Sequence, residues 1–323
     1  MFWDFHINNQ ESIHALMFLF GDRGLPSSVR HVNAYTGNTY KFTKSDGTYR
    51  YVRVHFLTNQ GIKYLSNSEG AKLAGTQPDY HILDLQDAIN SGNFPSWNLC
   101  VQTIDPNEIS NAPMDIFDMT KIWPHRQYPL RKVGRMVLDR NPANWFAEIE
   151  QAAFSPSNMV RGIEPSPDPM LQARMFAYPD AARYRLGINY QFLPTNAAKS
   201  EVYCPTQRDG QMNFTNNYGG DPNYTGAKIK QMSFVAQKQG AGTRVDAAVL
   251  HTLDRAEAGA PVSFASKVTD NDFEQATALW QLMGKQEGAQ SRLVNNVAAH
   301  VSGVKEKWIR DEVYGMSPCS HTE

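Results

Sequence analysis

The chain has 323 residues, a formal net charge of −1 at neutral pH, 41% hydrophobic and 20% charged residues. These values exclude fibrous and disordered classes and indicate a globular chain with room for a substantial core or two domains. The balanced charge argues against a nucleic-acid partner, and the lack of long apolar runs and of a signal-peptide pattern argues against a membrane or secreted chain.

The N-terminal part predicts a helix followed by four strands. Residues 11–20, ESIHALMFLF, have the pattern of an amphipathic helix. The strand segments are enriched in β-branched and aromatic residues and span residues 31–43, 48–58, 97–105 and 134–140. Period-two alternation is clearest in the second, where Val52, Val54 and Phe56 oppose Tyr51, Arg53 and His55. A helical insertion, from residues 68–75 to 85–92, separates the second strand from the third.

From Asn141 onward the pattern changes to helices and long connections rich in Pro, Gly and Asn. The longest irregular piece, residues 207–224, is expected to be an extended arm. After Val268 the spacing predicts two helices, whose apolar positions are Phe273, Ala276, Leu279, Trp280 and Met283 in the first and Leu293, Val297, Val301 and Val304 in the second.

The segment from Asp168 to Gly187 predicts one helix with clear ends. Asp168 is a good N-cap, Pro169 suits the first helical position and Gly187 suits the position after the last turn. Pro179 removes one backbone donor, so a bend is expected just beyond Tyr178.

Arg174, Tyr178 and Arg185 are spaced by four and seven residues, which places them on one face of this helix. Two guanidinium groups are therefore expected to bracket one phenol. The alternative is an ordinary amphipathic helix, in which the arginines extend along the surface and the tyrosines pack.

Many dispersed motifs decide between these interpretations. They follow one order and spacing: FLFGDRGLP, NQGIKYL, FPSWNL, IFDMTKIWPH, SPDPMLQARMFAYPDAARYRLG, QRDGQM and NYGGDPNY. With them the chain resembles the haem catalases of the small-subunit type, closely from Phe2 to about Tyr224 and more loosely in the C-terminal helices. The stretch RMFAYPDAARYRLG with its upstream SPDPMLQ is the most specific match.

The resemblance implies an α+β fold. We expect the second half of an antiparallel eight-stranded β-barrel, followed by an extended wrapping arm and a C-terminal helical region. The implied domains are a partial barrel haem domain at 1–140, a wrapping segment at 141–267 with the proximal haem helix at 169–186, and a helical domain at 268–323.

The resemblance also implies a haem b site, with Tyr178 as the axial ligand to the iron. A phenol titrates near pH ~10 in water, so a bound ferric iron and a neighbouring guanidinium would both favour its anion. The implied neighbours are Arg174 beside the phenolate, Asp168 available to Arg174, and Arg185 at a haem propionate. Phe154 and Met170 are expected to pack against the ring, or else to be simple core residues.

Two departures from the family pattern concern this site. Asn38, in the turn from Thr36 to Thr39, stands where the family has a proximal histidine. The distal histidine and asparagine of the family align upstream of Phe2, so we expect the chain to lack the N-terminal part that carries them. None of the following lies in a distal motif: His6, His14, His31, His55, His81 and His125.

A second cofactor, NADPH, is implied by nine further positions: His14, Phe18, Arg23, Asn33, Tyr35, His55, Trp123, His125 and Gln275. An arginine with two histidines suits a 2′-phosphate and a pyrophosphate. Against this, Gly21, Leu57 and Leu279 replace residues that are usually polar or aromatic, and the chain has no GxGxxG turn. The open alternative is that the nine residues form ordinary polar surface.

The implied reaction is the disproportionation of hydrogen peroxide to water and dioxygen. The alternatives are a haem-binding remnant without catalase activity and a catalase-like enzyme that acts on organic hydroperoxides. The implied assembly is a homotetramer in which the arm threads between subunits, with a missing N-terminal half as a further partner.

We expect a cytoplasmic location, with the peroxisome as the alternative, because the final residues His321, Thr322 and Glu323 are not an SKL-type signal. The three cysteines, Cys100, Cys204 and Cys319, are far apart and odd in number, which indicates free thiols in a reducing compartment.

Overall fold

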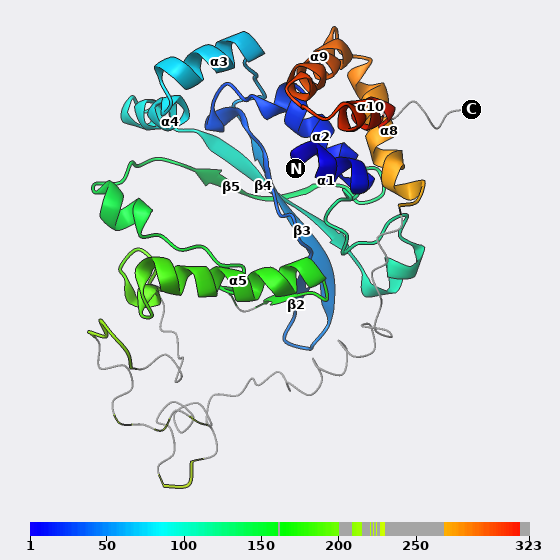
Figure 1. Ribbon diagram of the computed structural model, residues 1–323. Coiled ribbons are helices and arrows are strands. Elements are labelled where there is room, and N and C mark those ends of the chain that lie inside the picture. The colour runs from blue at the N-terminus through cyan, green and yellow to red at the C-terminus, as the bar shows by residue number, and fades with distance from the viewer. Residues whose placement is uncertain are drawn as a thin grey trace. The chain divides into compact units, whose positions relative to one another are not determined.

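The protein is described here by a computed structural model that covers residues 1–160, 162–199, 209–214, 220, 222, 224, 227–229 and 268–316. The chain divides into two compact units (Figure 1). The first unit comprises Met1–Gly37, Val52–Asn141 and Pro261–Glu323, and the second comprises Asn38–Tyr51 and Pro142–Ala260. The predicted three-part division of the sequence stays a prediction.

The strands form a mixed α+β structure around one sheet, in the order β5-β4-β3-β2-β6 with β1 beside β3. The pairs β1–β3, β2–β6 and β4–β5 are antiparallel. The strand bounds are Ala34–Tyr35 (β1), Tyr40–Thr43 (β2), Tyr49–Thr58 (β3), Ser96–Ile104 (β4), Arg131–Val137 (β5) and Ile163–Pro165 (β6).

The four predicted strands are present, with two corrections. The segment 31–43 is two strands rather than one, because a turn at residues 36–39 interrupts it. The last strand begins at Arg131 and ends at Val137, three residues earlier at each end than predicted. The short strand β6 was not predicted.

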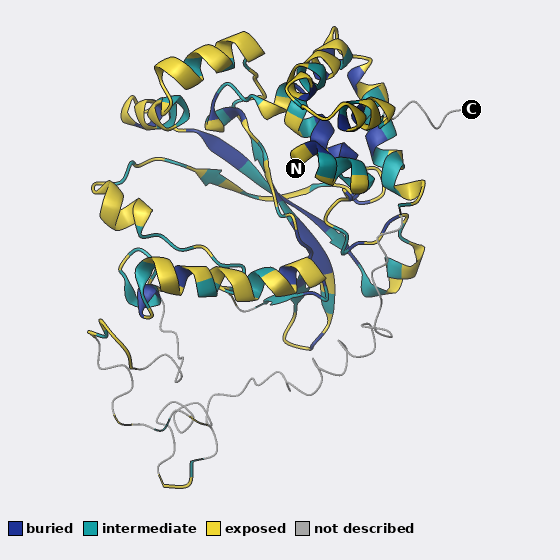
Figure 2. Ribbon diagram, in the orientation of Figure 1, coloured by how far each residue is buried: buried dark blue, intermediate teal, exposed yellow. Residues whose placement is uncertain are grey.

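Strand β3 has buried residues on both faces in its middle part, and its other residues are mostly half-buried (Figure 2). Tyr51 and Val52 are fully buried, and Arg53 and His55 are almost fully buried. The predicted alternation therefore does not produce a solvent-exposed polar face. The guanidinium of Arg53 donates to the main-chain carbonyls of Lys121, Ile116 and Asp118 and thereby replaces the water that it loses.

The first unit contains helices from both ends of the chain. The predicted helices at 11–20, in the insertion and after Val268 are confirmed, whereas α1 and α10 were not predicted. The bounds are Phe2–Asn8 (α1), Ile13–Phe20 (α2), Asn67–Thr76 (α3), Tyr80–Asn90 (α4), Asn271–Met283 (α8), Ala289–Ser302 (α9) and Lys307–Gly315 (α10), with short 3-10 turns at Gln10–Ser12 (η1), Asp22–Gly24 (η2), Val29–His31 (η3) and Pro106–Asn111 (η4).

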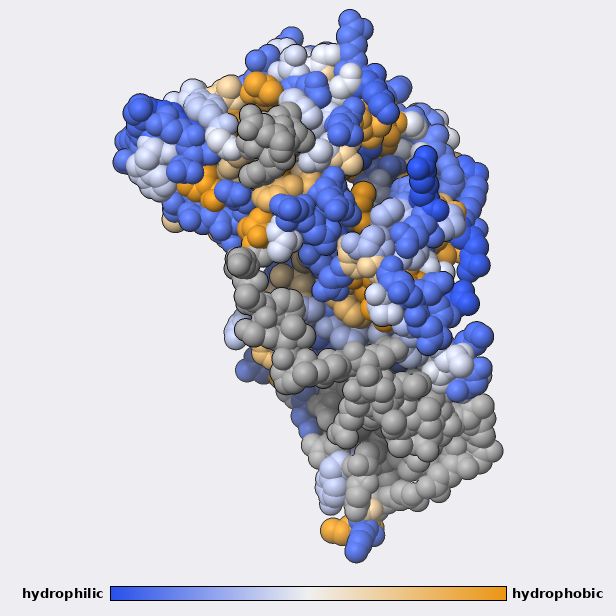
Figure 3. Space-filling view, turned by 90° about the vertical axis from the view of Figure 1, so that its right-hand side faces the viewer, coloured by the Kyte–Doolittle hydropathy of each residue, from blue (hydrophilic) through white to orange (hydrophobic). Residues whose placement is uncertain are grey.

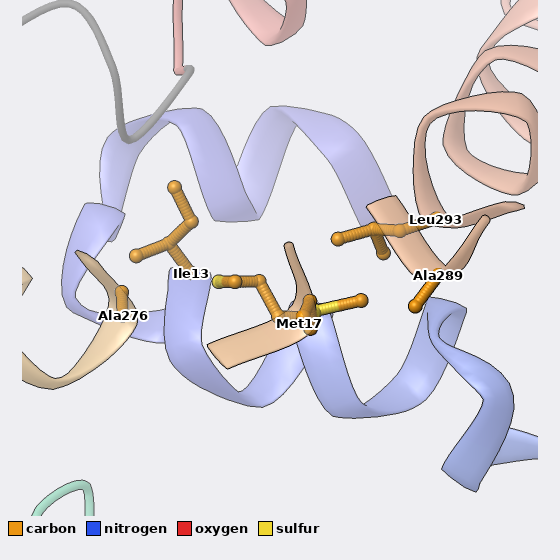
Figure 4. Packing of buried hydrophobic residues seen from close by; sticks show 6 residues of the cluster. Ile13, Met17, Ala276, Ala289 and Leu293 are labelled. Carbon is orange, nitrogen blue, oxygen red and sulfur yellow. The ribbon is translucent and has the colours of Figure 1, made fainter. Parts of the chain in front are cut away.

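N-terminal and C-terminal helices share a hydrophobic core. Figure 4 shows Ile13 and Met17 of α2 close to Ala276 of α8 and to Ala289 and Leu293 of α9. A second cluster joins Trp3, Leu16, Val301, Ile309 and Val313. Each large side chain in these clusters contributes about 1.5–3 kcal/mol by leaving water, so helices distant in sequence stabilise one another.

The second unit carries the helix α5, Pro169–Leu186, beside β2 (Figure 1). A single π-helical turn (η5, Phe146–Glu150) precedes it and a 3-10 turn (η6, Tyr190–Phe192) follows it. The predicted ends of α5 are confirmed: Asp168 caps the first turn, and Gly187 follows the last residue with φ 103°. The helix continues through Pro179 without interruption, and the bend itself stays a prediction.

None of the helices in the described ranges is long and apolar enough to span a membrane. On the face drawn in Figure 3, hydrophilic side chains predominate among the described residues and hydrophobic ones form small patches. Half of the predicted arm, residues 207–224, lies outside the described residues, as do Cys204, Cys319 and the last three residues. Cys100 is a buried free thiol.

Candidate proximal haem site

The fully buried carboxylate of Asp168 accepts four hydrogen bonds at the start of α5. Its Oδ1 accepts from the main-chain N–H groups of Met170 at 2.9 Å and Leu171 at 3.1 Å. Its Oδ2 accepts from Nδ2 of Asn38 at 3.0 Å and from the main-chain N–H of Thr39 at 3.2 Å. All four donors are neutral, so the carboxylate is stabilised without a cation in contact with it.

Asn38 lies between Asp168 and Arg174 and is fully buried. Its Nδ2 donates to Asp168, and its Oδ1 accepts from Nη1 of Arg174. The orientation of this amide is settled by chemistry, because a carboxylate only accepts and a guanidinium only donates. Among the described contacts Arg174 is linked to Asp168 through the amide of Asn38, and the part that Asp168 plays toward Arg174 stays a prediction.

Arg174 and Tyr178 contact each other one turn apart on α5. Nη2 of Arg174 donates to the phenol oxygen at 3.3 Å, and its guanidinium carbon lies 5.1 Å from the centre of the tyrosine ring. In the described part of the chain, no carboxylate lies within ion-pair distance of Arg174. The positive charge of Arg174 is thus free to stabilise an anion at the phenol oxygen.

Tyr178 differs from the other tyrosine near this arginine. Tyr178 is 43% exposed, so its ring lies open to solvent. Burial raises the pKa of Tyr40, although the charge of Arg174 opposes that effect. Tyr40 therefore stays a neutral phenol, and Tyr178 is the accessible oxygen beside the guanidinium.

Arg185 does not bracket the phenol as predicted. Its guanidinium donates to the main-chain carbonyls of Glu150 at 3.0 Å and Ala152 at 2.8 Å. It thereby holds the last residue of η5, Glu150, and the chain that leads from η5 to Phe154. The physical reason for the difference is that these carbonyls, at the end of the π turn and just after it, lie within reach of the last turn of α5.

Phe154 and Met170 are not core residues. Phe154 is 89% exposed and Met170 is 47% exposed, the latter on the same face of α5 as Tyr178. The sequence-based alternative, in which both are buried in the core, is therefore wrong for the described chain. Their exposure leaves apolar surface available in the second unit to a flat apolar group.

All nine residues of the predicted nucleotide site lie in the first unit, where contacts join some of them in two groups. The ring of His55 lies 5.3 Å from that of Tyr35 and 6.4 Å from that of His125, and Asn33 donates to Tyr35 at 3.0 Å. His14 packs on Phe18, whose ring lies 5.2 Å from the guanidinium carbon of Arg23.

The segment 120–125 carries two of the nine residues and is contacted by a third. Gln275 exchanges two hydrogen bonds of 2.9 Å with the main chain of Ile122. Trp123 and His125 belong to the segment itself. Gln275 thus holds the segment, and both polar atoms of its amide are already used.

Two polar atoms in this network are buried and have no partner among the described residues: Nδ1 of His55 and Nε1 of Trp123. The amide of Gln102 donates to the carbonyls of Trp123 and Tyr128, so its oxygen must accept from Nε2 of His55. Burial lowers the pKa of His55, which favours the neutral ring with a bare Nδ1. The two orphaned atoms are therefore one acceptor and one donor.

Sequence reasoning missed three residues that organise these sites. Thr39 supplies a main-chain donor to Asp168, Gln102 orients His55, and Lys121 binds Asp272 at the start of α8. Their partners are distant in sequence, so no local spacing could have indicated them. One sequence signal could have indicated such residues. It is a polar residue, such as Gln102, inside a segment whose other residues predict a buried strand.

The comparisons with known proteins bear on the whole chain. The family model described as Catalase matches residues 1–231. The chain belongs to the catalase family. Among similar proteins, the peroxisomal catalase of Pichia angusta is 43% identical over 315 residues, which cover 97% of this chain and 60% of that protein. The catalase of Cavia porcellus is 43% identical over 302 residues, or 93% of this chain and 54% of that protein.

Solved structures place the fold in the same family. The crystal structure of a fungal catalase matches with a TM-score of 0.85 and 45% identity, and covers 98% of this chain and 61% of that one. Catalase A from Saccharomyces cerevisiae matches with a TM-score of 0.85 and 41% identity, over 98% of this chain and 64% of that one. The antiparallel sheet corresponds to part of the catalase fold, and the chain spans about 60% of the length of the relatives it matches.

Proposed function

We propose that this chain supplies the proximal side of a catalase that converts hydrogen peroxide to water and dioxygen at a tyrosinate-ligated haem b. The contact between Arg174 and Tyr178 on α5 carries the proposal. In it, Tyr178 is the axial ligand to the iron, and Arg174 and Asp168 tune the ligand from the proximal side. The strands of the first unit then form the second half of an eight-stranded barrel.

The residues present fit a haem. An accessible phenol lies beside a guanidinium that has no carboxylate in contact among the described residues, and Met170 and Phe154 offer exposed apolar surface for a flat ring. A bound haem would supply an iron that takes electrons from one peroxide and returns them to another. Tyr178 would hold the iron, and Arg174 would favour the anionic form of the ligand by donating to it. Arg185 keeps further donors for a propionate beyond the two that its carbonyl contacts use.

The groups that cleave the peroxide bond are proposed to come from another polypeptide segment. The described part of the second unit contains no histidine. The alternatives are a haem-binding chain without catalase activity and an enzyme for organic hydroperoxides. Oxygen evolution from peroxide by the haem-loaded chain distinguishes the first alternative, and product analysis with a lipid hydroperoxide tests the second.

We propose NADPH as a further ligand, held by the network around residues 120–125. The supporting observation is the pair of orphaned atoms on His55 and Trp123, one acceptor and one donor, which a nucleotide with hydroxyl and amide groups would satisfy. Isothermal titration of the chain with NADPH tests this. Retained affinity in a His55→Phe, Trp123→Phe double variant would contradict it.

The assembly and the location are proposed on the same family basis. We propose a homotetramer, which light scattering would test, and a strictly monomeric, stable species would contradict it. We propose a cytoplasmic protein with the peroxisome as the alternative. Several of the similar proteins, including that of Pichia angusta, are named peroxisomal catalases, which favours the alternative. Imaging of a tagged chain would distinguish the two locations.

The haem proposal is tested by reconstitution. Addition of haem to the purified chain should give the absorption spectrum of a high-spin ferric tyrosinate complex. A chain that leaves haem unbound, or that binds it without this spectrum, would contradict the assignment of Tyr178.

A further inference from the structure

A cavity of about 260 Å³ lies within the first unit, between the N-terminal helices α1 and α2 and the C-terminal helices α8, α9 and α10, which pack together (Figure 1). Val294 and Tyr314 line it and are 53% and 57% exposed, so they mark its opening to solvent. The buried side chains that line it are Trp3, Ile13, Leu16, Met17, Leu293 and Val313. We propose that this cavity is a binding site for a small, uncharged aromatic molecule. None of the described residues that line it belongs to the sites proposed above for haem and NADPH.

The lining selects against water and against charged molecules. None of the described side chains in it carries a charge. The indole N–H of Trp3 is already used, because it donates to Nδ1 of His300 at 2.9 Å. A buried water needs about two to four polar partners, and an unpaired charge is costly to bury, so neither suits these walls.

The size of the cavity suits a single substituted ring. An apolar cavity of about 150 Å³ stays dry and binds benzene, which sets the scale for one unsubstituted ring. The present cavity of about 260 Å³ is larger, so a ring with a short substituent fits it. A substituent that reaches the opening would meet Tyr314, which carries the one hydroxyl group among the described lining residues.

The chemistry of the walls favours an aromatic ligand over a saturated one. Trp3 and Trp280 line the cavity, as do the thioethers of Met17 and Met316. Aromatic rings attract one another in edge-to-face and offset contacts, and thioether sulfur makes favourable contacts with ring edges. A saturated hydrocarbon would gain from leaving water alone, whereas an aromatic ring gains from these contacts as well.

A ligand in this cavity would connect the two hydrophobic clusters of the helices. Met17 and Leu293 belong to one cluster (Figure 4), whereas Trp3 and Val313 belong to the other. All four side chains line the cavity. An occupant would therefore contact helices from both ends of the chain and would stabilise their packing by binding only to the folded state.

The first experiment uses the full chain labelled with ¹³C in its methionine methyl groups, with toluene as the probe. Met17 and Met316 line the cavity, whereas Met114, which is buried, and Met119, which is exposed, lie elsewhere in the same unit. Each signal is assigned by its loss in a Met→Leu variant. We expect saturable shifts of the Met17 and Met316 signals and unchanged Met114 and Met119 signals.

Benzoate is the matched charged probe, because it has the same ring with a carboxylate in place of the methyl group. It should leave all four signals unchanged at concentrations about ten-fold above those that saturate with toluene. The proposal is overturned if toluene gives no saturable shift of the two cavity signals, if it shifts the Met119 signal equally, or if benzoate acts like toluene.

The second experiment fills the cavity from α9. Ala298 lines it, whereas Ala299 is exposed and lies outside the lining. Ala298→Phe should lower the affinity for toluene about ten-fold or more, because the new ring occupies the space, and Ala299→Phe should leave the affinity unchanged. Equal affinities in the two variants would overturn the proposal. If Ala298→Phe fails to fold, the comparison of toluene with benzoate in the unaltered chain decides.

Discussion

Arg174 donates a hydrogen bond to the phenol oxygen of Tyr178 from one turn earlier on α5, at 3.3 Å. The same guanidinium is held at its other amino group by Asn38. The arginine is therefore oriented before any ligand arrives, so little side-chain entropy would be lost when an anion forms at the phenol.

Replacement of Tyr178 by phenylalanine should abolish the tyrosinate spectrum of the haem-loaded chain and leave the fold intact. The phenol is exposed, so its loss leaves no buried group unsatisfied. Arg174→Ala should weaken haem retention less severely, because the ligand itself remains. Circular dichroism checks the fold, and an unchanged absorption spectrum in Tyr178→Phe would remove the central assignment.

Asp168→Ala should lower the free energy of unfolding by about 2–4 kcal/mol, since the carboxylate caps two amides of α5 and also binds Asn38 and Thr39. Asp180 lies on the same helix and makes no hydrogen bond or ion pair within the described residues. Asp180→Ala should therefore change stability by less than about 0.5 kcal/mol. Chemical denaturation of the haem-free chain measures both, and equal effects would contradict the capping role.

Stability should fall as the pH drops below about 6.5, the ordinary imidazole value. Burial lowers the pKa of His14. The main chain at Thr120 opposes this shift, and the charge of Lys121 adds to it. Burial also lowers the pKa of His55. The unfolded chain thus binds protons at a higher pH than the folded chain, so acid favours unfolding until the folded-state values are passed. Denaturation midpoints from pH 8 to 5 test this.

The matched variants for the pH test are His14→Gln and His55→Gln. Each should flatten the fall in stability between pH 7 and 5, and the double variant should flatten it further. The comparison concerns the slope with pH rather than the stability at one pH, because His55→Gln also alters the contact with Gln102. A slope that is unchanged in the double variant would show that neither ring is responsible.

The helix α5 was readable from the sequence because its signals are local. Asp168, Pro169 and Gly187 specify its ends through their own backbone and side-chain chemistry, and the spacing of Arg174 and Tyr178 specifies their contact. The strands β3 and β4 were readable for a similar reason, since runs of β-branched and aromatic residues indicate burial in a sheet.

The remaining features depend on contacts between residues far apart in sequence. Asn38 and Arg174 are 136 residues apart in sequence. They make contact because the turn before β2 lies beside the first part of α5. Arg185 binds one carbonyl at the end of a π turn and one just after it, and no residue pattern predicted that turn. Strand β6 has three residues and ends in proline, so it exists through its pairing with β2 rather than through its own propensity.

The ion pair between Lys121 and Asp272 should stabilise the start of α8 substantially. The ammonium lies 2.6 Å from the carboxylate and is almost fully buried. Asp272→Asn should lower the free energy of unfolding by about 2–4 kcal/mol, because it leaves the buried ammonium with the more distant carboxylate of Asp118 at 3.4 Å and the neutral hydroxyl of Thr120 at 3.0 Å. Adding Lys121→Met should restore about 1 kcal/mol or more, since the uncompensated charge is then gone.

The control for this pair is an exposed one on α10. Lys307 and Asp311 lie 3.2 Å apart, with side chains that are 81% and 59% exposed. Asp311→Asn should cost less than about 0.5 kcal/mol, because water screens the pair. Thermal or chemical denaturation measures both variants, and equal losses at the two sites would show that burial does not set the value of the Lys121 pair.

Strand β5 presents an edge that should promote association. Among the described residues it pairs only with β4, and most of its side chains are exposed. Its register steps from Gly134 to Lys132 opposite Leu99 and Cys100, which leaves Val133 as the extra residue of a bulge, 54% exposed. Unpaired N–H and C=O groups beside an exposed valine form a template for another strand.

The chain alone should therefore self-associate and evolve oxygen weakly or not at all, because strand partners and distal groups are both proposed to come from another segment. Val133→Lys should reduce association in light scattering and change the free energy of unfolding by less than about 0.5 kcal/mol, since a charge at the edge opposes pairing without touching the core. Co-expression with the N-terminal part of a related catalase should raise solubility and oxygen evolution together, because one partner supplies both. Full activity of the purified chain would contradict this account, as it would require an acid–base group within residues 1–323.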